Sequence, residues 1–408
     1  MKILVIGLGY VGLPLACLLA QKNNFVVGVD INNQLVDSIN SGRLVTLEPG
    51  LSELLKTTKR NGNFIAQINI EPANVFIICV PSPLTEENKP DLSFINSAVM
   101  SLIPFLKPKD LIIIESTIPV GTTDKIKDLI LMNCPHISYN ELYVAHCPER
   151  VLPGNAINEI IYNNRIIGGT CNESTKLAVE LYSTFCTEEV VTTTARMTEL
   201  VKLSENSFRD INIAYANELS IICDELDLNT TELIKLANMH PRVNILSPGV
   251  GVGGHCIPVD PWFIVNEAPD ITPLISTARM VNRFKEDWVV EKIVDISNKN
   301  EIESIVLAGL SYKSNTDDFR ESPSLRIAEK LLEKCSLNIT LVDPYIDKIK
   351  SNNLNQFRLS KEINISNNIL IAILLITTIV ETLNGVKVLS LAKKKFANIF
   401  RIAKAGIP

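Results

Sequence analysis

A chain of 408 residues is too long for a single hydrophobic core, so its length predicts two or three domains. Hydrophobic residues make up 46% and charged residues 21%, which is typical of a folded globular protein and not of a disordered one. The formal net charge of −6 provides no basic surface for nucleic acid, and we expect no nucleic-acid partner.

The first third of the chain alternates short apolar runs with amphipathic stretches. Apolar runs of four to six residues are typical of buried parallel strands, and the stretches between them have helical spacing. This alternation predicts a doubly wound α/β domain. The expected strands are 2–6, 25–29, 75–80 and 111–115, and the expected helices are 12–21, 35–40 and 51–60.

The loop after the first expected strand has the spacing Gly-x-Gly-x-x-Gly and opens the first expected helix. Asp30 ends the next strand, which completes the context of a dinucleotide-binding fingerprint. A carboxylate there accepts hydrogen bonds from ribose hydroxyls and repels a 2′-phosphate, so NAD is favoured over NADP. The alternative is a glycine-rich turn that binds no dinucleotide. The loop residues expected to contact the cofactor are Gly7, Gly9, Tyr10, Val11 and Gly12.

One long helical pattern follows from residue 198 to about 226, without Gly or Pro, and a second helical stretch runs from Pro261 to about 290. Apolar runs at 304–310 and 339–344 then begin a second α/β domain. The predicted fold class is α/β, with two Rossmann-like doubly wound domains joined by a long central helix. We place an NAD-binding domain at 1–197, a central helical and dimerisation domain at 198–296, and a second Rossmann-like domain at 297–408.

Nine cysteines are spaced irregularly, without a Cys-x-x-Cys pair, which predicts reduced thiols and neither a metal site nor a disulfide framework. The apolar N-terminal run lacks the cleavage site of a signal peptide. The longest late apolar run, 369–380, is about half of the ~20 residues that a membrane helix needs, so we expect a core strand. The expectation is a cytoplasmic protein without a membrane partner.

Six further motifs occur in the order of a known family. They are Glu115-Ser-Thr-Ile-Pro-Val-Gly121, Cys147-Pro-Glu-Arg-Val-Leu-Pro-Gly154, Lys202 with Asn206, Gly251-Val-Gly-Gly-His-Cys-Ile-Pro-Val-Asp260, Gly309-Leu-Ser-Tyr-Lys313 and Arg320-Glu-Ser322. Over about residues 1–345 the chain resembles the UDP-glucose/UDP-N-acetylmannosamine dehydrogenase family. Within it, segments 240–245 and 255–264 look most like the UDP-N-acetyl-D-mannosamine enzymes. The glucose enzymes tend to carry Gly-Gly-Ser-Cys followed by Lys-Asp, whereas Val259 precedes Asp260 here.

The resemblance implies NAD-dependent oxidation of a UDP-sugar alcohol to a carboxylate, which supplies surface polysaccharide precursors. An aldehyde cannot lose hydride until a nucleophile adds to its carbonyl, and a thiolate at Cys256 would give a thiohemiacetal and then a thioester. Cys256 lies in a glycine-rich loop just before a helix expected to start at Asp260, and a helix N-terminus favours a thiolate. The other catalytic residues implied by the resemblance are Lys202, Asn206, Glu149, Asp260 and Thr117.

Lys202 is expected to exchange the proton of the sugar hydroxyl, and Asn206 is expected to form a hydrogen bond with the same oxygen. Glu149 and Asp260 are expected to activate water or to hold Lys202 in place. Ser82, Thr117 and Arg320 are expected at the cofactor. Each charged candidate has a structural alternative as an ordinary ion-pair residue. The residues implied to bind the UDP-sugar are Arg150, Val151, Lys202, Asn206, Arg209, His240, Arg242, Gly253 and Lys313. The long helix and the resemblance together imply a homodimer.

Beyond Pro344 the chain departs from the family, because 371–380 is almost wholly apolar and the end, 402–408, lacks an expected aspartate. Several functions stay open at this point. One is the same chemistry on UDP-N-acetylglucosamine or UDP-glucose. Another is a two-electron β-hydroxy acid dehydrogenase, which would share the glycine loop and a helical lysine but would not need Cys256. The third is a non-catalytic nucleotide-sugar-binding protein, which the divergent end favours.

Overall fold

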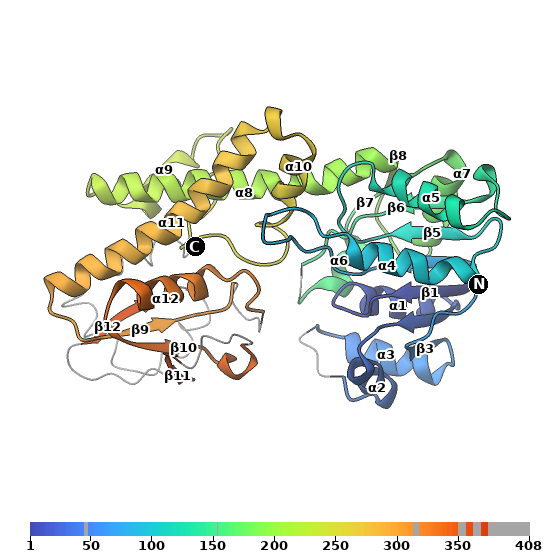
Figure 1. Cartoon of the computed structure of the whole chain (residues 1–408), viewed down its shortest axis with the longest axis horizontal. Coiled ribbons are helices and arrows are strands. Elements are labelled where there is room, and N and C mark those ends of the chain that lie inside the picture. The colour runs from blue at the N-terminus through green and yellow to red at the C-terminus, as the bar shows by residue number, and fades with distance from the viewer. Residues whose placement is uncertain (45–47, 153, 313–317, 350–355, 362–368, 374–408) are drawn as a thin grey trace. The chain divides into compact units, whose positions relative to one another are not determined.

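The computed structural model describes residues 1–44, 48–152, 154–312, 318–349, 356–361 and 369–373 (Figure 1). The chain divides into two compact units, which we call the first and second units. The first unit contains residues 1–205 and 262–268, and the second contains residues 206–261 and 269–408. The division into three domains at residues 197 and 296 stays a prediction.

The first unit is built on an eight-stranded sheet in the order β3-β2-β1-β4-β5-β6-β7-β8. All neighbouring strands are parallel except β6 and β7. Ile6, Ile78, Ile114 and His146 lie opposite one another along β1, β4, β5 and β6, so the loops after these strands share one edge of the sheet. The strands are β1 (Lys2–Ile6), β2 (Phe25–Val29), β3 (Phe64–Gln67), β4 (Val75–Ile78), β5 (Leu111–Ile114), β6 (Tyr143–His146), β7 (Arg165–Gly169) and β8 (Val190–Thr194).

Helices cover both faces of this sheet (Figure 1). Along β1, Ile3 and Val5 face a core shared with α1, α2, α3, α6 and α7, whereas Leu4 and Ile6 face a core shared with α4 and α5. Burial on both faces explains why the strands are continuous apolar runs. The helices are α1 (Gly12–Gln21), α2 (Asn33–Ser41), α3 (Leu51–Arg60), α4 (Ser93–Leu102), η1 (Ile103–Phe105), α5 (Thr122–Asn133), η2 (Tyr139–Glu141), α6 (Ala156–Tyr162) and α7 (Asn172–Tyr182).

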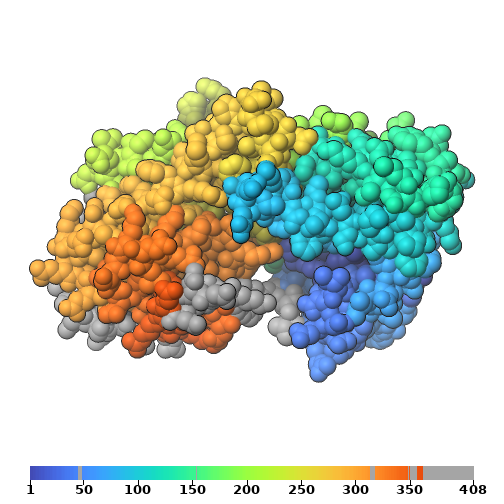
Figure 2. Space-filling view, in the orientation of Figure 1, coloured from blue at the N-terminus to red at the C-terminus, as the bar shows by residue number. Residues whose placement is uncertain are grey.

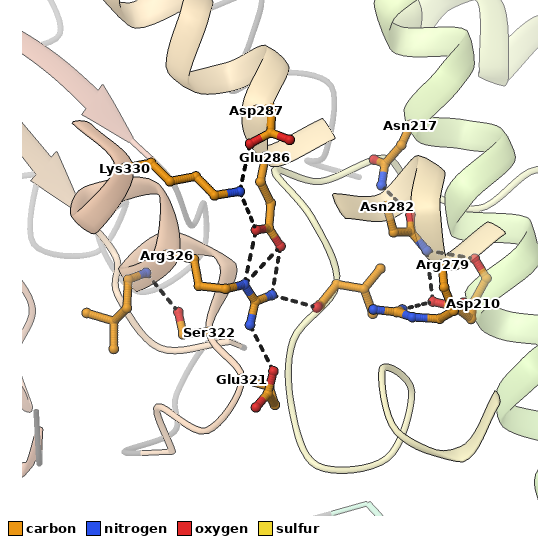
Figure 3. A network of polar contacts seen from close by, with 12 residues as sticks. Asp210, Asn217, Arg279, Asn282, Glu286, Asp287, Glu321, Ser322, Arg326 and Lys330 are labelled. Carbon is orange, nitrogen blue, oxygen red and sulfur yellow. Dashed lines mark hydrogen bonds and ion pairs between the residues drawn. The ribbon is translucent and has the colours of Figure 1, made fainter. Parts of the chain in front are cut away.

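The long helix α8 (Ala195–Glu225) begins in the first unit and ends in the second, and α10 (Asp260–Glu267) also crosses the division. Within the second unit α8 is fixed to α11 (Pro273–Lys299) by buried polar contacts (Figure 3). Asp210 on α8 accepts hydrogen bonds from Arg279 at 2.5 Å and from Asn282 at 2.8 Å, both on α11. Specific polar pairs therefore hold α8 and α11 together.

A four-stranded parallel sheet in the order β11-β10-β9-β12 forms the second α/β layer. Its core is made by β9, β10, α11 and α12, and it includes Leu307, Ile293 and Leu331. In the space-filling view the side chains of α11 and α12 form a continuous outer surface (Figure 2). The remaining elements are α9 (Thr230–Ala237), η3 (Pro269–Ile271), β9 (Ser304–Ala308), α12 (Pro323–Lys334), β10 (Asn338–Val342), η4 (Ile346–Lys348), β11 (Arg358–Ser360) and β12 (Ile369–Ile373).

The same type of carboxylate–backbone hydrogen bond occurs in both sheets. Asp30, after β2, accepts a hydrogen bond from the backbone N–H of Leu8 at 2.9 Å. Asp343, after β10, accepts one from the backbone N–H of Leu310, also at 2.9 Å. In both places a carboxylate after one strand holds the loop that follows the neighbouring strand, which confirms the prediction of two Rossmann-like layers and a long helix along the chain between them.

The late apolar run forms a strand over Ile369–Ile373, and its remainder lies outside the described residues, as do the C-terminal residues that depart from the family. All nine cysteines lie in described segments, and none is in a disulfide. In the described part of the chain, no helix is both long enough and apolar enough to cross a membrane.

Candidate active site

The glycine loop between β1 and α1 is too tight for side chains on its inner side. A Cβ on Gly12 would lie 1.9 Å from the carbonyl oxygen of Gly7. Gly9, in contrast, is exposed, and a Cβ there would meet nothing within 4 Å. Open space therefore lies in front of the loop and of the N-terminus of α1, where amide donors and the helix dipole favour a pyrophosphate.

Asp30 is placed to hold both the loop and a ribose. Its Oδ2 accepts from Leu8 N and its Oδ1 from Asn32 N, each at 2.9 Å. A carboxylate has about four acceptor positions, so two remain for ribose hydroxyls. The loop and Asp30 together fit a bound NAD.

The loops after β4 and β5 are tied together beside this edge. Ser82 donates a hydrogen bond from Oγ to the carbonyl oxygen of Thr117 at 2.6 Å, and buried Ser116 donates to the carbonyl of Val80 at 2.7 Å. The structure thus brings together Ser82 and Thr117, two residues predicted near the cofactor. Ser116 had no predicted role, although its place inside the Glu-Ser-Thr motif was a signal.

Lys202 and Glu149 form a buried pair in the first unit, with 3.8 Å between Nζ and Oε2. Glu149 follows β6, where its Oε1 accepts a hydrogen bond from Val151 N and its own N–H donates to the carbonyl of Glu115. A lysine ammonium beside a carboxylate can give a proton to a substrate oxygen, and the neutral amine of the same lysine can take one from it. The structure thus brings these two predicted residues together.

His146 connects this pair to the β5 loop, a role that the sequence did not suggest. Its Nδ1 lies 2.8 Å from the Thr198 hydroxyl and its Nε2 lies 3.4 Å from the Ser116 carbonyl. Burial, opposed by the Ser116 carbonyl and aided by the charge of Lys202, lowers the pKa of His146 to about 3, so the ring is neutral. The Thr198 hydroxyl donates to the carbonyl of Ala195 at 2.7 Å, so the neutral ring donates from Nδ1 to the Thr198 oxygen. Thr198 lies one helical turn before Lys202.

The first turn of α8 is also fixed by Glu199, which is fully buried. Its carboxylate accepts from the backbone N–H of Gly121 at 2.5 Å and from that of Thr123 at 2.8 Å. These amides belong to the N-terminus of α5, where a carboxylate satisfies unpaired donors and complements the helix dipole. Glu199 therefore anchors the helix segment that presents Lys202.

Beneath the loops after β5 and β6 lies a buried charged cluster. Glu115 accepts hydrogen bonds from Arg165 at 3.2 Å and from the hydroxyl of Tyr182 at 2.5 Å, and Arg165 also contacts the Cys147 sulfur at 3.7 Å. Burial raises the pKa of Glu115, with Arg165 opposing the shift. Because Glu115 immediately precedes Ser116 and its carbonyl binds Glu149, this cluster supports both loops.

The second unit contains the predicted nucleophile. Cys256 is half-buried, and its carbonyl accepts the backbone N–H of Asp260 at 2.8 Å in the turn that leads into α10. Asn206 donates from Nδ2 to Oδ2 of Asp260 at 2.6 Å, and both side chains are buried. Asn206 lies one turn after Lys202 on α8. Adjacent turns of this helix therefore carry Lys202, which pairs with Glu149, and Asn206, which pairs with Asp260.

Arg320, predicted at the cofactor, is paired within the second unit. It donates to Asp318 at 2.6 Å, and its Nη2 lies 3.2 Å from Nδ1 of His255. Burial acts to raise the pKa of Asp318, but hydrogen bonds from His255 and Arg320 hold it well below its usual range. His255 precedes the nucleophile, so Arg320 contacts the neighbour of Cys256.

The residues predicted to bind the substrate belong to both units of the chain. Arg150 makes an ion pair with Glu205 at 2.6 Å in the first unit. Arg209, His240 and Arg242 are exposed. Lys313 lies outside the described residues.

Comparison with known proteins identifies the family. Three models of the UDP-glucose/GDP-mannose dehydrogenase family match in order: the NAD binding domain over residues 1–186, the central domain over 196–284 and the UDP binding domain over 306–398. The chain belongs to this family. It is accordingly an NAD-dependent nucleotide-sugar dehydrogenase, and the predicted cofactor is confirmed.

Individual relatives are similar over most of the chain. A UDP-N-acetyl-D-mannosamine dehydrogenase of Campylobacter jejuni is 46% identical, over 85% of this chain and 88% of its own. An NDP-N-acetyl-D-galactosaminuronic acid dehydrogenase of Ralstonia nicotianae is also 46% identical, over 84% and 82%. A solved UDP-D-ManNAc dehydrogenase of Pyrococcus horikoshii is 35% identical and superposes with a TM-score of 0.85, covering 96% of this chain and 93% of that one.

Proposed function

We propose that this protein oxidises UDP-N-acetyl-D-mannosamine to UDP-N-acetyl-D-mannosaminuronate with two NAD and one water, as a step that supplies surface polysaccharide precursors. The observation that carries the proposal is the 46% identity to the Campylobacter enzyme over 85% of the chain. The segment around Cys256, with His255 before the cysteine and Val259 before Asp260, supports the same substrate.

In the first oxidation Lys202 accepts the proton of the sugar hydroxyl, while Asn206 donates a hydrogen bond to the oxygen on which charge develops. Glu149, 3.8 Å from Lys202, stabilises the resulting ammonium. NAD, when bound, would supply the hydride acceptor for both oxidations. Thr117, Ser82 and the glycine loop are assigned to cofactor contact.

In the second oxidation the thiolate of Cys256 adds to the aldehyde carbon and forms a thiohemiacetal. Loss of hydride from that carbon gives a thioester, in which the carbon–sulfur bond is retained. Water then adds to the thioester carbon and the sulfur leaves, which releases the carboxylate. Glu149 or Asp260 takes the proton from the attacking water.

A second candidate substrate is the nucleotide-linked N-acetylgalactosamine sugar, since the Ralstonia relative is equally identical. It would use the same residues, because the two N-acetylhexosamines differ in ring stereochemistry and not at the carbon that is oxidised. UDP-N-acetylglucosamine and UDP-glucose are further competitors. A two-electron β-hydroxy acid enzyme and a non-catalytic binding protein are disfavoured by the three matching family domains.

We also propose that the protein is a cytoplasmic homodimer formed through α8. Large apolar side chains recur every seven residues along this helix in the second unit, at Phe208, Tyr215 and Ile222, and all three are exposed. A seven-residue repeat places them in one stripe, as at a helix–helix interface. A cytoplasmic location fits reduced cysteines and NAD as a co-substrate. Light scattering of the wild type and of Phe208→Asp tests the dimer, and an unchanged monomer mass in both would exclude it.

The test of the function is a panel of UDP-sugars with NAD, followed by NADH absorbance and by identification of the product. We expect the fastest turnover with UDP-N-acetyl-D-mannosamine and a uronate as product. Cys256→Ser should abolish uronate formation and leave NAD binding intact, whereas Cys335→Ser, at a half-buried cysteine of the same unit, should leave both intact. Faster turnover with a galactosamine or glucose sugar would replace the proposed substrate.

A further inference from the structure

The loop that carries Cys256 lies against the segment leading into α12. A Cβ on Gly253 would be 2.7 Å from the carbonyl oxygen of Glu321 and 2.7 Å from the Cδ of Pro323. The backbone N–H of Gly254 donates to the carbonyl of Arg320 at 3.2 Å. A side chain at Gly253 would push these two backbones apart, so the loop depends on this contact for its position.

One guanidinium joins this loop to the two helices beside it. Arg326, on α12, donates to both carboxylate oxygens of Glu286 on α11, with a shortest distance of 2.7 Å, and to Glu321 at 3.0 Å (Figure 3). Its Nη2 also donates to the carbonyl oxygen of Val252 at 3.5 Å. Val252 lies four residues before Cys256. Loop, α11 and the start of α12 thus meet at a single side chain.

The geometry requires arginine. A planar guanidinium has five donors in a fixed fork, and here they serve two carboxylates and one carbonyl in different directions. Glu286 is almost fully buried, and Arg326 is its nearer cationic partner at 2.7 Å, with Lys330 at 3.5 Å. The carbonyl of Val252 is also in a buried residue, and a lost donor leaves it free to turn.

We propose that Arg326 is a positioning residue for Cys256, acting through the Val252 carbonyl on the loop that carries the nucleophile. The inference rests on the proposed role of Cys256 as the thiolate that adds to the aldehyde. Because that thiolate takes part only in the second oxidation, loss of Arg326 slows the second oxidation and leaves the first largely unchanged. A merely stabilising residue would not separate the two steps.

Lys330 provides a matched control on the same helix. It binds the same Glu286 carboxylate at 3.5 Å and Asp287 at 2.8 Å (Figure 3). Within the described residues its ion pairs go to α11 alone. Replacing Lys330 therefore removes a positive charge from the same network without removing a donor to the loop.

The experiment measures NADH formation in a single turnover, with full-length enzyme in excess over the nucleotide sugar that the panel identifies. For Arg326→Met we expect the second NADH phase to slow by about 10- to 100-fold, the loss typical of a misplaced reacting group. In the same variant, the rate at which iodoacetamide alkylates Cys256 should differ from the wild-type rate. Lys330→Met should keep both phases and the wild-type alkylation rate.

Arg326→Lys keeps the charge but cannot serve Glu286 and Val252 together, so it should recover thermal stability and not the second phase. This variant also carries the test if Arg326→Met does not fold. A wild-type second phase in Arg326→Lys, or equal slowing of both phases in the Arg326 and Lys330 variants, would overturn the proposal.

If instead Cys256→Ser still forms acid, the proposed function has failed. If Cys256→Ser is inactive but the Arg326 variants are normal, only the present inference has failed.

Discussion

Replacement of Arg165 by Met probes the buried cluster under the active-site loops. Arg165 and Glu115 are almost fully buried, and Arg165 is the only cation paired with Glu115 among the described residues. Methionine keeps the volume of the arginine stem and removes the charge. Glu115 then keeps one donor, the hydroxyl of Tyr182, and its Oε2 already lacks a hydrogen-bond partner in the described structure.

Removing one partner of a buried ion pair costs about 3–5 kcal/mol of the free energy of unfolding. We expect the lower end, about 3 kcal/mol, because the hydrogen bond from Tyr182 remains. Arg150→Met is the control, since its pair with Glu205 is about one-third exposed and such pairs contribute about 0–1 kcal/mol. Urea unfolding followed by circular dichroism measures both variants.

The loss in free energy of unfolding caused by Arg165→Met, which we call the stability deficit, should depend on pH in a defined direction. Burial raises the pKa of Glu115 in the folded protein, and loss of Arg165 raises it further. A carboxyl whose folded pKa exceeds its unfolded value binds more protons when folded, so falling pH stabilises the fold. The stability deficit of Arg165→Met should therefore shrink as the pH falls through the folded-state pKa of Glu115 in the variant, and should level off below its folded-state pKa in the wild type, since the unfolded-state pKa is common to both proteins. A loss below about 1 kcal/mol, or a deficit that is constant with pH, would refute this reasoning.

Three further predictions concern single side chains. Asp30→Ala should weaken NAD binding by at least about 10-fold, because ribose contacts and the Leu8 bond are both lost, and unchanged affinity in a fluorescence titration would contradict it. Asn206→Ala should lower kcat by about 10²-fold with little change in KM, since its bond matters most as charge develops, and a change in KM alone would contradict that role. Glu199→Ala should lower the free energy of unfolding, measured with urea, by about 2–4 kcal/mol because two amides at the helix end lose their acceptor. Replacement of the exposed Glu188 by Ala should leave the free energy of unfolding almost unchanged, and equal effects of the two substitutions would contradict the anchoring role.

Local signals made much of the fold predictable. The first strand, the glycine loop and Asp30 lie within 30 residues, and each carries a pattern that follows from strand burial or from close backbone approach. The predicted strands at 75–80 and 111–115 end at Ile78 and Ile114, because the following residues turn into the loops that bear Ser82 and Thr117.

The supporting contacts were not predictable in the same way. Glu199 meets Gly121, and Arg326 meets Glu286, across long stretches of sequence. Nothing in the sequence marks one glutamate or arginine among many as the buried one, since that depends on tertiary packing. Motifs assigned roles to Cys256, Lys202 and Asn206, and those roles stay predictions. The specific bond between Asn206 and Asp260 could be found only in the structure.

The number of NADH molecules formed per acid released tests the account most directly. With UDP-N-acetyl-D-mannosamine in limiting amount and NAD in excess, the proposed sequence of two oxidations predicts two NADH for each uronate. One NADH for each nucleotide sugar consumed, with an aldehyde as the product and no uronate, would contradict the thioester route through Cys256.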